Sequence, residues 1–235
     1  MDTDDVPMGT PTVRTVQVGT PQALGESAGR PWDSSFVRVP SPECRWLFTR
    51  HLAGNVQADT ENHGRPDQAV LVYAACHYPA WRAELGRSDI GPGGFAENLT
   101  VDGLDESTVA LGDLYAVGDA RLRVTAPRFP CFKIGLRWSD PSLPTRVSKT
   151  GRTGWYCAVE REGMVVPNAP MILVERPWPL LTVALANDLC YGRSDDVDAA
   201  EAMGRCPVMP ERWTRRVIAG ADRTRREQRG EALAP

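Results

Sequence analysis

Alternating hydrophobic and polar residues predict a series of short β-strands along most of the chain. The clearest alternation, with a period of two, runs over residues 12–18 and again over residues 120–126. Gly112 and Gly118, each followed by an aspartate, are typical of tight turns on either side of a further strand. Short strands joined by turns rich in glycine and proline favour a β-barrel or a β-sandwich. The predicted strands cover residues 12–18, 36–39, 114–117, 120–126, 155–160 and 171–175.

Helical spacing occurs in two other parts of the chain. Residues 68–85 carry an apolar stripe, with Tyr73, His77 and Trp81 at four-residue spacing, which predicts one helix. Pro79 would end or kink that helix, because proline lacks a backbone donor. Beyond a Pro-Trp-Pro sequence, the C-terminal part predicts three helices over residues 180–189, 195–203 and 210–228.

These patterns divide the chain into three parts. Residues 1–12 are polar, contain two prolines and are predicted to be disordered. Residues 13–177 are expected to form a mainly β domain with helices, and residues 178–235 a three-helix extension.

The composition narrows the class of protein. A formal net charge of -3 on 235 residues gives no general reason to expect a nucleic acid or a membrane as a partner. No segment is apolar and long enough to span a bilayer, and the acidic Met1–Asp5 is unlike a signal peptide, so we expect a cytoplasmic protein. Six cysteines without a CxxC pair are expected to be reduced thiols, and three histidines complete no zinc motif. Walker and GxGxxG motifs are also absent from the sequence.

The segment PRFPCFK is the most informative motif. Pro127 and Pro130 stiffen the backbone that leads to Cys131. Arg128 and Lys133 would lower the pKa of the thiol and could hold an anion beside it. A rigid, electropositive thiolate suits a nucleophile or a ligand to a soft metal. The alternative is a small buried hydrophobic side chain, which is the usual state of a free cysteine.

Further motifs follow one another in the order typical of a known family. They are QAD at 57–59, HG at 63–64, DQAV at 67–70, HYPAW at 77–81, GFAENL at 94–99, GD at 112–113, PRFPCFK at 127–133, TGWY at 153–156 and ERP at 175–177. In these motifs the chain resembles the YiiM-like branch of the MOSC (molybdenum cofactor sulfurase C-terminal) domain family. The resemblance covers residues 12–177, and the helical tail is similar to the C-terminal three-helix extension of that branch.

The resemblance implies a fold, a cofactor and a reaction. The fold would be a β-barrel with peripheral helices, and the cofactor a molybdopterin-type molybdenum cofactor with Cys131 as a ligand to the metal. The protein would reduce N-hydroxylated small molecules with electrons from an external flavoprotein or iron–sulfur protein. A thiolate is a soft ligand, which agrees with this metal site.

A polar stretch over residues 50–67 is rich in turn formers and suggests a binding loop. His63 titrates near neutrality and could pass a proton to an N–O group, with Asp59 orienting it. Both residues suit a turn nearly as well. Glu97 and Asn98 follow a run of glycines, where a backbone can approach a ligand closely. Cofactor contacts are therefore expected from Glu97, Asn98, Arg128 and Lys133.

Several positions depart from the family's pattern. An arginine expected after the Gly-Trp-Tyr strand is Ala158, and its loss would weaken contact with the pterin phosphate unless Arg65 or Arg176 compensates. We therefore include Arg65 among the expected cofactor contacts. The other departures are Asn55 in a Gly-Asp pair, Ala96 in Gly-Glu-Asn-Leu, Asn168 in a later Gly-Asp pair, and Gly29-Arg30-Pro31-Trp32, a loose match to Lys-x-Pro.

Three hypotheses remain open at this point. The first is a molybdenum-dependent N–O reductase. The second is a sulfur carrier or cofactor-binding module that uses Cys131 without redox turnover, and it predicts a sulfane adduct on metal-free protein. The third is a domain that has lost the cofactor, for which Asn55 and Ala158 are the support. The sequence leaves open the exact substrate, the electron donor and the formation of a homodimer.

Overall fold

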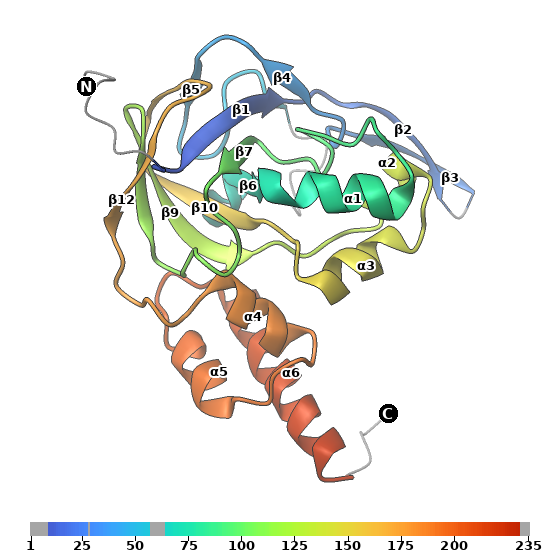
Figure 1. Ribbon diagram of the computed structural model, residues 1–235, viewed down its shortest axis with the longest axis vertical. Coiled ribbons are helices and arrows are strands. Elements are labelled where there is room, and N and C mark those ends of the chain that lie inside the picture. Colours follow the sequence, from blue (N-terminus) through green and yellow to red (C-terminus); the bar gives the residue numbers. More distant parts are fainter. Residues whose placement is uncertain (1–8, 28, 57–63, 231–235) are drawn as a thin grey trace.

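The computed structural model describes residues 9–27, 29–56 and 64–230 (Figure 1). Its centre is a mixed sheet of eight strands, in the order β12-β8-β9-β10-β6-β7-β1-β4. Neighbouring strands are antiparallel except β6 and β7, which are parallel. The strands are β1 (Thr12–Val18), β4 (Val39–Ser41), β6 (Val70–Ala74), β7 (Leu99–Asp102), β8 (Leu114–Val117), β9 (Ala120–Pro127), β10 (Trp155–Arg161) and β12 (Met171–Glu175).

Two small sheets and several helices surround the large sheet. The hairpin of β2 (Gln22–Ser27) and β3 (Arg30–Ser34) forms one small sheet, and β5 (Arg45–Leu47) with β11 (Gly163–Val165) forms the other. In the described part of the chain, no helix combines the length and the apolar character needed to cross a membrane. The helices are α1 (Tyr78–Leu85), α2 (Lys133–Trp138), α3 (Leu143–Thr150), α4 (Val183–Cys190), α5 (Val197–Gly204) and α6 (Glu211–Gln228), with short 3₁₀ turns η2 (Pro66–Gln68) and η3 (Ala75–His77).

The predicted closed barrel is not established by the strand pairing. Next to β12, an isolated bridge joins Pro170 to Thr12 at the start of β1. Two backbone hydrogen bonds flank it, from Val13 N–H to Ala169 O and from Met171 N–H to Pro11 O. Among the described residues β1 and β12 form no ladder, so the fold is a mixed sheet with helices and a closed barrel stays a prediction.

Five of the six predicted strands are confirmed, with small changes at their ends. The strand predicted for residues 36–39 is wrong, because only Val39 belongs to a strand, β4. Four alternating residues are too few to separate a strand from a turn that buries alternate side chains. Here Ser35 and Phe36 form a turn that carries the chain from β3 towards β4.

The single helix predicted for residues 68–85 is also wrong in its first half. Residues 70–74 form β6, and all five are buried because both faces of the strand are covered. Val70, Val72 and Ala74 pack into one core cluster and Tyr73 into another. A short run of apolar residues fits a buried strand and a buried helix equally well, so its periodicity is ambiguous. Only the second half is the helix α1, and Pro79 lies in its first turn, where no backbone donor is required.

The three predicted C-terminal helices are confirmed, and Figure 1 shows α4, α5 and α6 together on one side of the sheet. Side-chain oxygens cap two of them, since Thr182 accepts from Leu185 N–H and Asp196 from Ala199 N–H. Apolar residues of these helices share one core with the strands. The boundary near residue 177 therefore stays a prediction. The disorder predicted for residues 1–12 falls mainly on residues 1–8, outside the described residues; Thr12 already belongs to β1.

Arg176 and Asp113 tie the end of β12 to the turn before β8. Arg176 Nε and Nη2 lie 2.9 and 2.6 Å from the two carboxylate oxygens of Asp113, which is fully buried. We expect Arg176→Ala to lower the free energy of unfolding by about 2–4 kcal/mol, because a buried carboxylate loses its counter-ion. Arg14→Ala breaks a similar but exposed pair with Asp102 and should change the free energy of unfolding by less than about 1 kcal/mol. Both free energies are measured by urea titration. Equal effects of the two substitutions would contradict this explanation.

Candidate functional site

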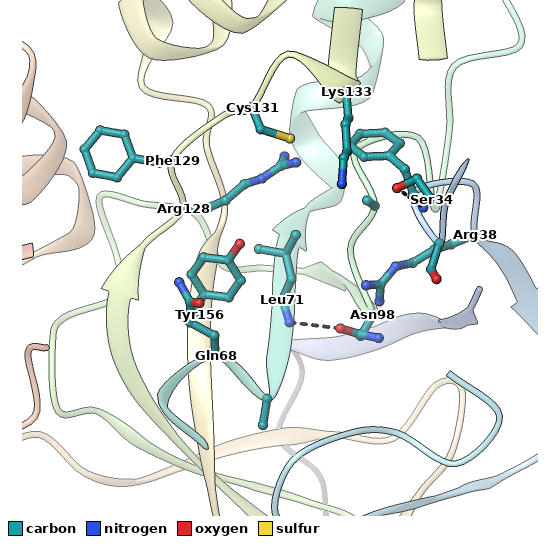
Figure 2. Close-up of a pocket in the computed structure, with 14 residues that line it drawn as sticks. Ser34, Arg38, Gln68, Leu71, Asn98, Arg128, Phe129, Cys131, Lys133 and Tyr156 are labelled. Carbon is teal, nitrogen blue, oxygen red and sulfur yellow. Dashed lines mark hydrogen bonds between the residues drawn. The ribbon is translucent and has the colours of Figure 1, made fainter. Parts of the chain in front are cut away.

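A cavity of about 110 Å³ lies beside Cys131 (Figure 2). Segments far apart in the sequence meet around it. They are the turn after β3, the ends of η2 and β6, the loop before β7, the segment after β9, and β10. The lining residues are Ser34, Ser35, Phe36, Arg38, Gln68, Ala69, Leu71, Ala96, Asn98, Arg128, Phe129, Cys131, Lys133 and Tyr156.

The PRFPCFK segment places Cys131 between a strand and a helix. The strand β9 ends at Pro127 and α2 begins at Lys133, with Ile134 N–H donating to Cys131 O at 3.1 Å. Cys131 is half-buried. In Figure 2 its sulfur, the Arg128 guanidinium and the Lys133 amine point towards the same space. The predicted grouping of these three residues is therefore seen in the structure.

Arg38 and Arg128 bring two cations to the cavity with part of their hydrogen-bonding capacity unused. Nε and Nη1 of Arg38 and Nη1 of Arg128 are buried and have no hydrogen-bond partner among the described residues. Burial lowers the pKa of Arg38 to about 10, so this guanidinium still carries its charge at neutral pH. Buried donors without partners are rare in folded proteins and destabilise them. Grouped at one cavity, these donors suit an anionic ligand, which would supply the missing acceptors.

Asn98 is a third residue at the cavity with a donor that has no partner in the described part of the chain. Its Oδ1 accepts from Leu71 N–H at 3.1 Å, as Figure 2 shows, and this bond fixes the orientation of the amide. Nδ2 is consequently left buried without a partner. Ala96, two residues earlier, lines the cavity with a φ of 62°, a left-handed conformation that glycine adopts more easily. The glycine in the family's pattern thus has a physical explanation.

Glu97 does not line the cavity, although we predicted a cofactor contact. Its carboxylate is fully buried and turned into the loop itself. Four donors from within the protein occupy it, so its role here is to hold the loop that presents Asn98. The donors are Gly93 N–H at 2.6 Å, Phe95 N–H at 3.1 Å, Thr100 Oγ1 at 2.9 Å, and the hydroxyl of Tyr78.

Other predicted residues lie elsewhere. Arg65 is exposed and does not line the cavity, and Arg176 binds Asp113. His63 and Asp59 fall outside the described residues.

Two departures from the family's pattern also lie away from the cavity. Asn55 is buried and its Oδ1 accepts from Gly19 N–H at 3.2 Å, which is a structural contact. Ala158 pairs with Arg123 in the sheet. Neither Asn55 nor Ala158 lines the cavity, so they do not alter its lining directly.

Sequence reasoning missed Arg38, which lines the cavity from the turn after β3. The signal was present: Arg38-Val39-Pro40 has the spacing of the family's Lys-x-Pro, and it is a better match than Arg30-Pro31. Its position in a predicted strand concealed it.

Tyr156 of β10 was also missed, although it belongs to the TGWY motif. Burial raises its pKa, so its phenol stays protonated at neutral pH and can donate a hydrogen bond into the cavity.

The donors around Cys131 fit an anionic organic cofactor that brings its own metal ligands. Within the described ranges, no group of three or more histidine, cysteine, aspartate or glutamate side chains is placed to hold a metal ion. The described part of the chain thus offers the Cys131 thiol, but no wider set of such side chains, to a metal in this cavity. The unpartnered nitrogens of Arg38, Arg128 and Asn98 supply the complementary hydrogen-bond donors for such a group.

Comparison with known proteins identifies the family. The family model "MOSC domain" matches residues 59–171. The uncharacterized protein YflK of Bacillus subtilis is 34% identical over 212 residues, which cover 90% of this chain and 95% of YflK. A protein of Gibberella moniliformis named "Reductase" is 37% identical over 156 residues, 64% of this chain and 27% of its own length. The crystal structure of YiiM from Geobacillus stearothermophilus has a TM-score of 0.75 at 28% identity and covers 90% of this chain and 99% of its own. The chain therefore belongs to the MOSC domain family and is similar to YiiM.

Proposed function

We propose that this protein binds a molybdenum cofactor and reduces N-hydroxylated small molecules, with Cys131 as the protein's ligand to molybdenum. The observation that carries the proposal is the set of buried, unpartnered donors on Arg38, Arg128 and Asn98 around the half-buried thiol. Membership of the MOSC family and similarity to a protein named "Reductase" support it. The cofactor supplies two-electron redox chemistry at a metal soft enough to accept a thiolate.

The chain's own residues divide the remaining work. Arg38, Arg128 and Lys133 neutralise the anionic part of the cofactor, and Asn98 donates a hydrogen bond to it. Cys131 is fixed between β9 and α2, so its sulfur has a defined place relative to these donors.

Reduction of an N–O bond to an amine and water consumes two electrons and two protons. The Tyr156 phenol lines the cavity, and because burial raises its pKa it stays protonated and can donate a hydrogen bond to the N–O group. In this proposal His63, oriented by Asp59, is the proton donor. The electrons come from a separate flavoprotein or iron–sulfur protein.

Arg128 beside Cys131 also favours a second function, because a cation stabilises a persulfide anion as well as a thiolate. In that case Cys131 would carry sulfur without redox turnover. Mass spectrometry of metal-free protein distinguishes the two functions, since a carrier would show a sulfane adduct at Cys131 and a reductase would not require one.

The reductase proposal is tested by turnover of the loaded protein. Protein from a cofactor-competent, molybdate-supplied host is mixed with a reduced viologen dye and an aryl hydroxylamine. We expect oxidation of two dye molecules for each amine formed, and no turnover by protein from a host without the cofactor. Loaded protein that oxidises no dye with hydroxylamines, amidoximes or N-oxides would contradict the proposal.

A further inference from the structure

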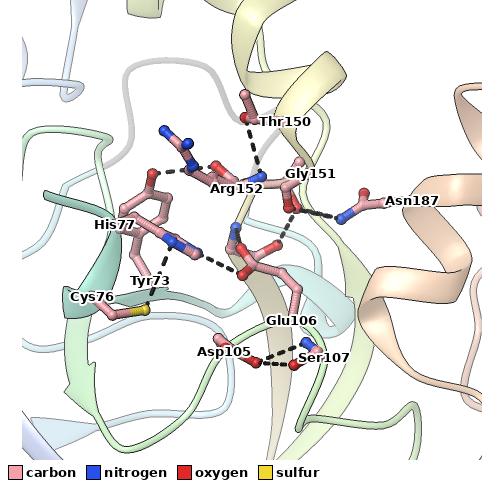
Figure 3. Close-up of polar contacts among 12 residues, drawn as sticks. Tyr73, Cys76, His77, Asp105, Glu106, Ser107, Thr150, Gly151, Arg152 and Asn187 are labelled. Carbon is pink, nitrogen blue, oxygen red and sulfur yellow. Dashed lines mark hydrogen bonds and ion pairs between the residues drawn. The ribbon is translucent and has the colours of Figure 1, made fainter. Parts of the chain in front are cut away.

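Residues 151–154 connect α3 to β10 without regular secondary structure. Buried side chains from three separate elements nevertheless hold this segment (Figure 3). Tyr73 of β6 donates to Arg152 O at 3.2 Å. Asn187 of α4 donates through Nδ2 to Gly151 O at 3.2 Å and to Thr153 Oγ1 at 2.9 Å. These hydrogen bonds hold the backbone of the short loop in one position.

Glu106, in the loop after β7, provides the last of these contacts. Its Oε1 accepts from Gly154 N–H at 2.7 Å, and its Oε2 lies 2.6 Å from His77 Nε2. The residue is 5% exposed. A buried carboxylate is stable only with such partners, so His77 and Gly154 together define where it lies.

Gly154 connects this carboxylate to the cavity. Its N–H donates to Glu106, while its carbonyl accepts from Arg128 N–H at 3.0 Å. Gly154 has a φ of +72°, and a Cβ there would lie 2.4 Å from Val72 O, so no other residue fits without a shift. The backbone of Arg128 is thus bonded to the carbonyl of a residue whose N–H is held by Glu106.

We propose that Glu106 is a positioning residue for Arg128. Through Gly154 it fixes the backbone from which the Arg128 guanidinium reaches the anionic ligand, and His77 holds Glu106 in place from the opposite side. The inference rests on the proposed anion site around Cys131. It concerns Glu106, which does not line that cavity and accepts a hydrogen bond from Gly154 N–H.

Isothermal titration of the purified full chain with inorganic pyrophosphate tests this role. We expect Glu106→Leu to weaken pyrophosphate binding about tenfold, the effect typical of residues that orient a group which itself contacts the ligand. Glu106→Gln should retain most of the affinity, because its carbonyl still accepts from Gly154 N–H. Asp113→Leu removes an equally buried carboxylate from a network that does not reach the cavity, so it should lower the melting temperature without weakening binding.

Arg128→Met separates the claim that the cavity binds an anion from the claim that Glu106 positions Arg128. Wild-type affinity in Glu106→Leu together with weak binding in Arg128→Met would overturn the positioning role and leave the anion site intact. Undetectable binding by the wild type, or unchanged binding in Arg128→Met, would overturn the anion site and the positioning role with it. Equal weakening by Glu106→Leu and Asp113→Leu would show a general loss of structure and would also overturn the positioning role.

Discussion

Arg38→Met is expected to reduce the affinity for the cofactor at least about a hundredfold. Arg38 offers two buried, unpartnered N–H groups to a ligand, and a charge-assisted hydrogen bond contributes about 1.5–3 kcal/mol. Two such bonds correspond to about 3–6 kcal/mol, or about two to four powers of ten in affinity. The measurement is the pterin content per chain after purification and dialysis, read from the fluorescence of the released, oxidised cofactor.

The same substitution should stabilise the free protein. A buried guanidinium without a carboxylate partner is unfavourable in the absence of ligand, and a methionine of similar length removes that charge. We expect the free energy of unfolding of cofactor-free protein to rise by about 1–2 kcal/mol. Arg14→Met, at an exposed ion pair, serves as the control and should change neither pterin content nor stability appreciably. Destabilised Arg38→Met protein that keeps its pterin would show a structural role instead.

Cys131→Ser is expected to abolish N–O reduction, with a loss of at least about a hundredfold in turnover, while much of the pterin is retained. The proposed function assigns separate roles, in which the sulfur would ligate the metal and Arg38 and Arg128 would hold the anionic part of the cofactor. A serine hydroxyl is a hard, weakly acidic donor and replaces a thiolate poorly at a soft metal. Turnover with a reduced viologen and an aryl hydroxylamine is measured alongside pterin content.

Cys44→Ser is the matched control for this prediction, because Cys44 is a free, exposed cysteine that does not line the cavity. It should leave turnover and pterin content unchanged. Full activity in Cys131→Ser would exclude Cys131 as an essential ligand. Loss of pterin and metal in equal measure would show that the thiol, rather than the arginines, anchors the whole cofactor.

The strands that could be predicted from the sequence are those with one buried face. Residues 12–18 and 120–126 alternate because one side of each strand meets the core, and both are strands in the structure. Residues 70–74 gave no such signal, because both faces of β6 pack into the core and all of its residues are buried. The packing on the second face is set by tertiary structure, which local sequence does not show.

The candidate site also contains residues that a local motif predicts and residues that only the tertiary structure brings in. Arg128, Cys131 and Lys133 belong to one short motif, so their grouping could be predicted from sequence. Arg38 comes from a distant turn and meets them only through the fold. Glu97 lay in the right loop, but the N–H groups of Gly93 and Phe95 draw its carboxylate inward, a choice that local sequence does not reveal.

The most direct test of the account is the molybdenum and pterin content of the wild-type protein from a cofactor-competent, molybdate-supplied host. Elemental analysis and cofactor fluorescence should each give close to one equivalent per chain, and Arg38→Met should lose both. Wild-type protein with neither, from cells in which a known molybdoenzyme is fully loaded, would contradict the central claim that the Cys131 cavity holds this cofactor.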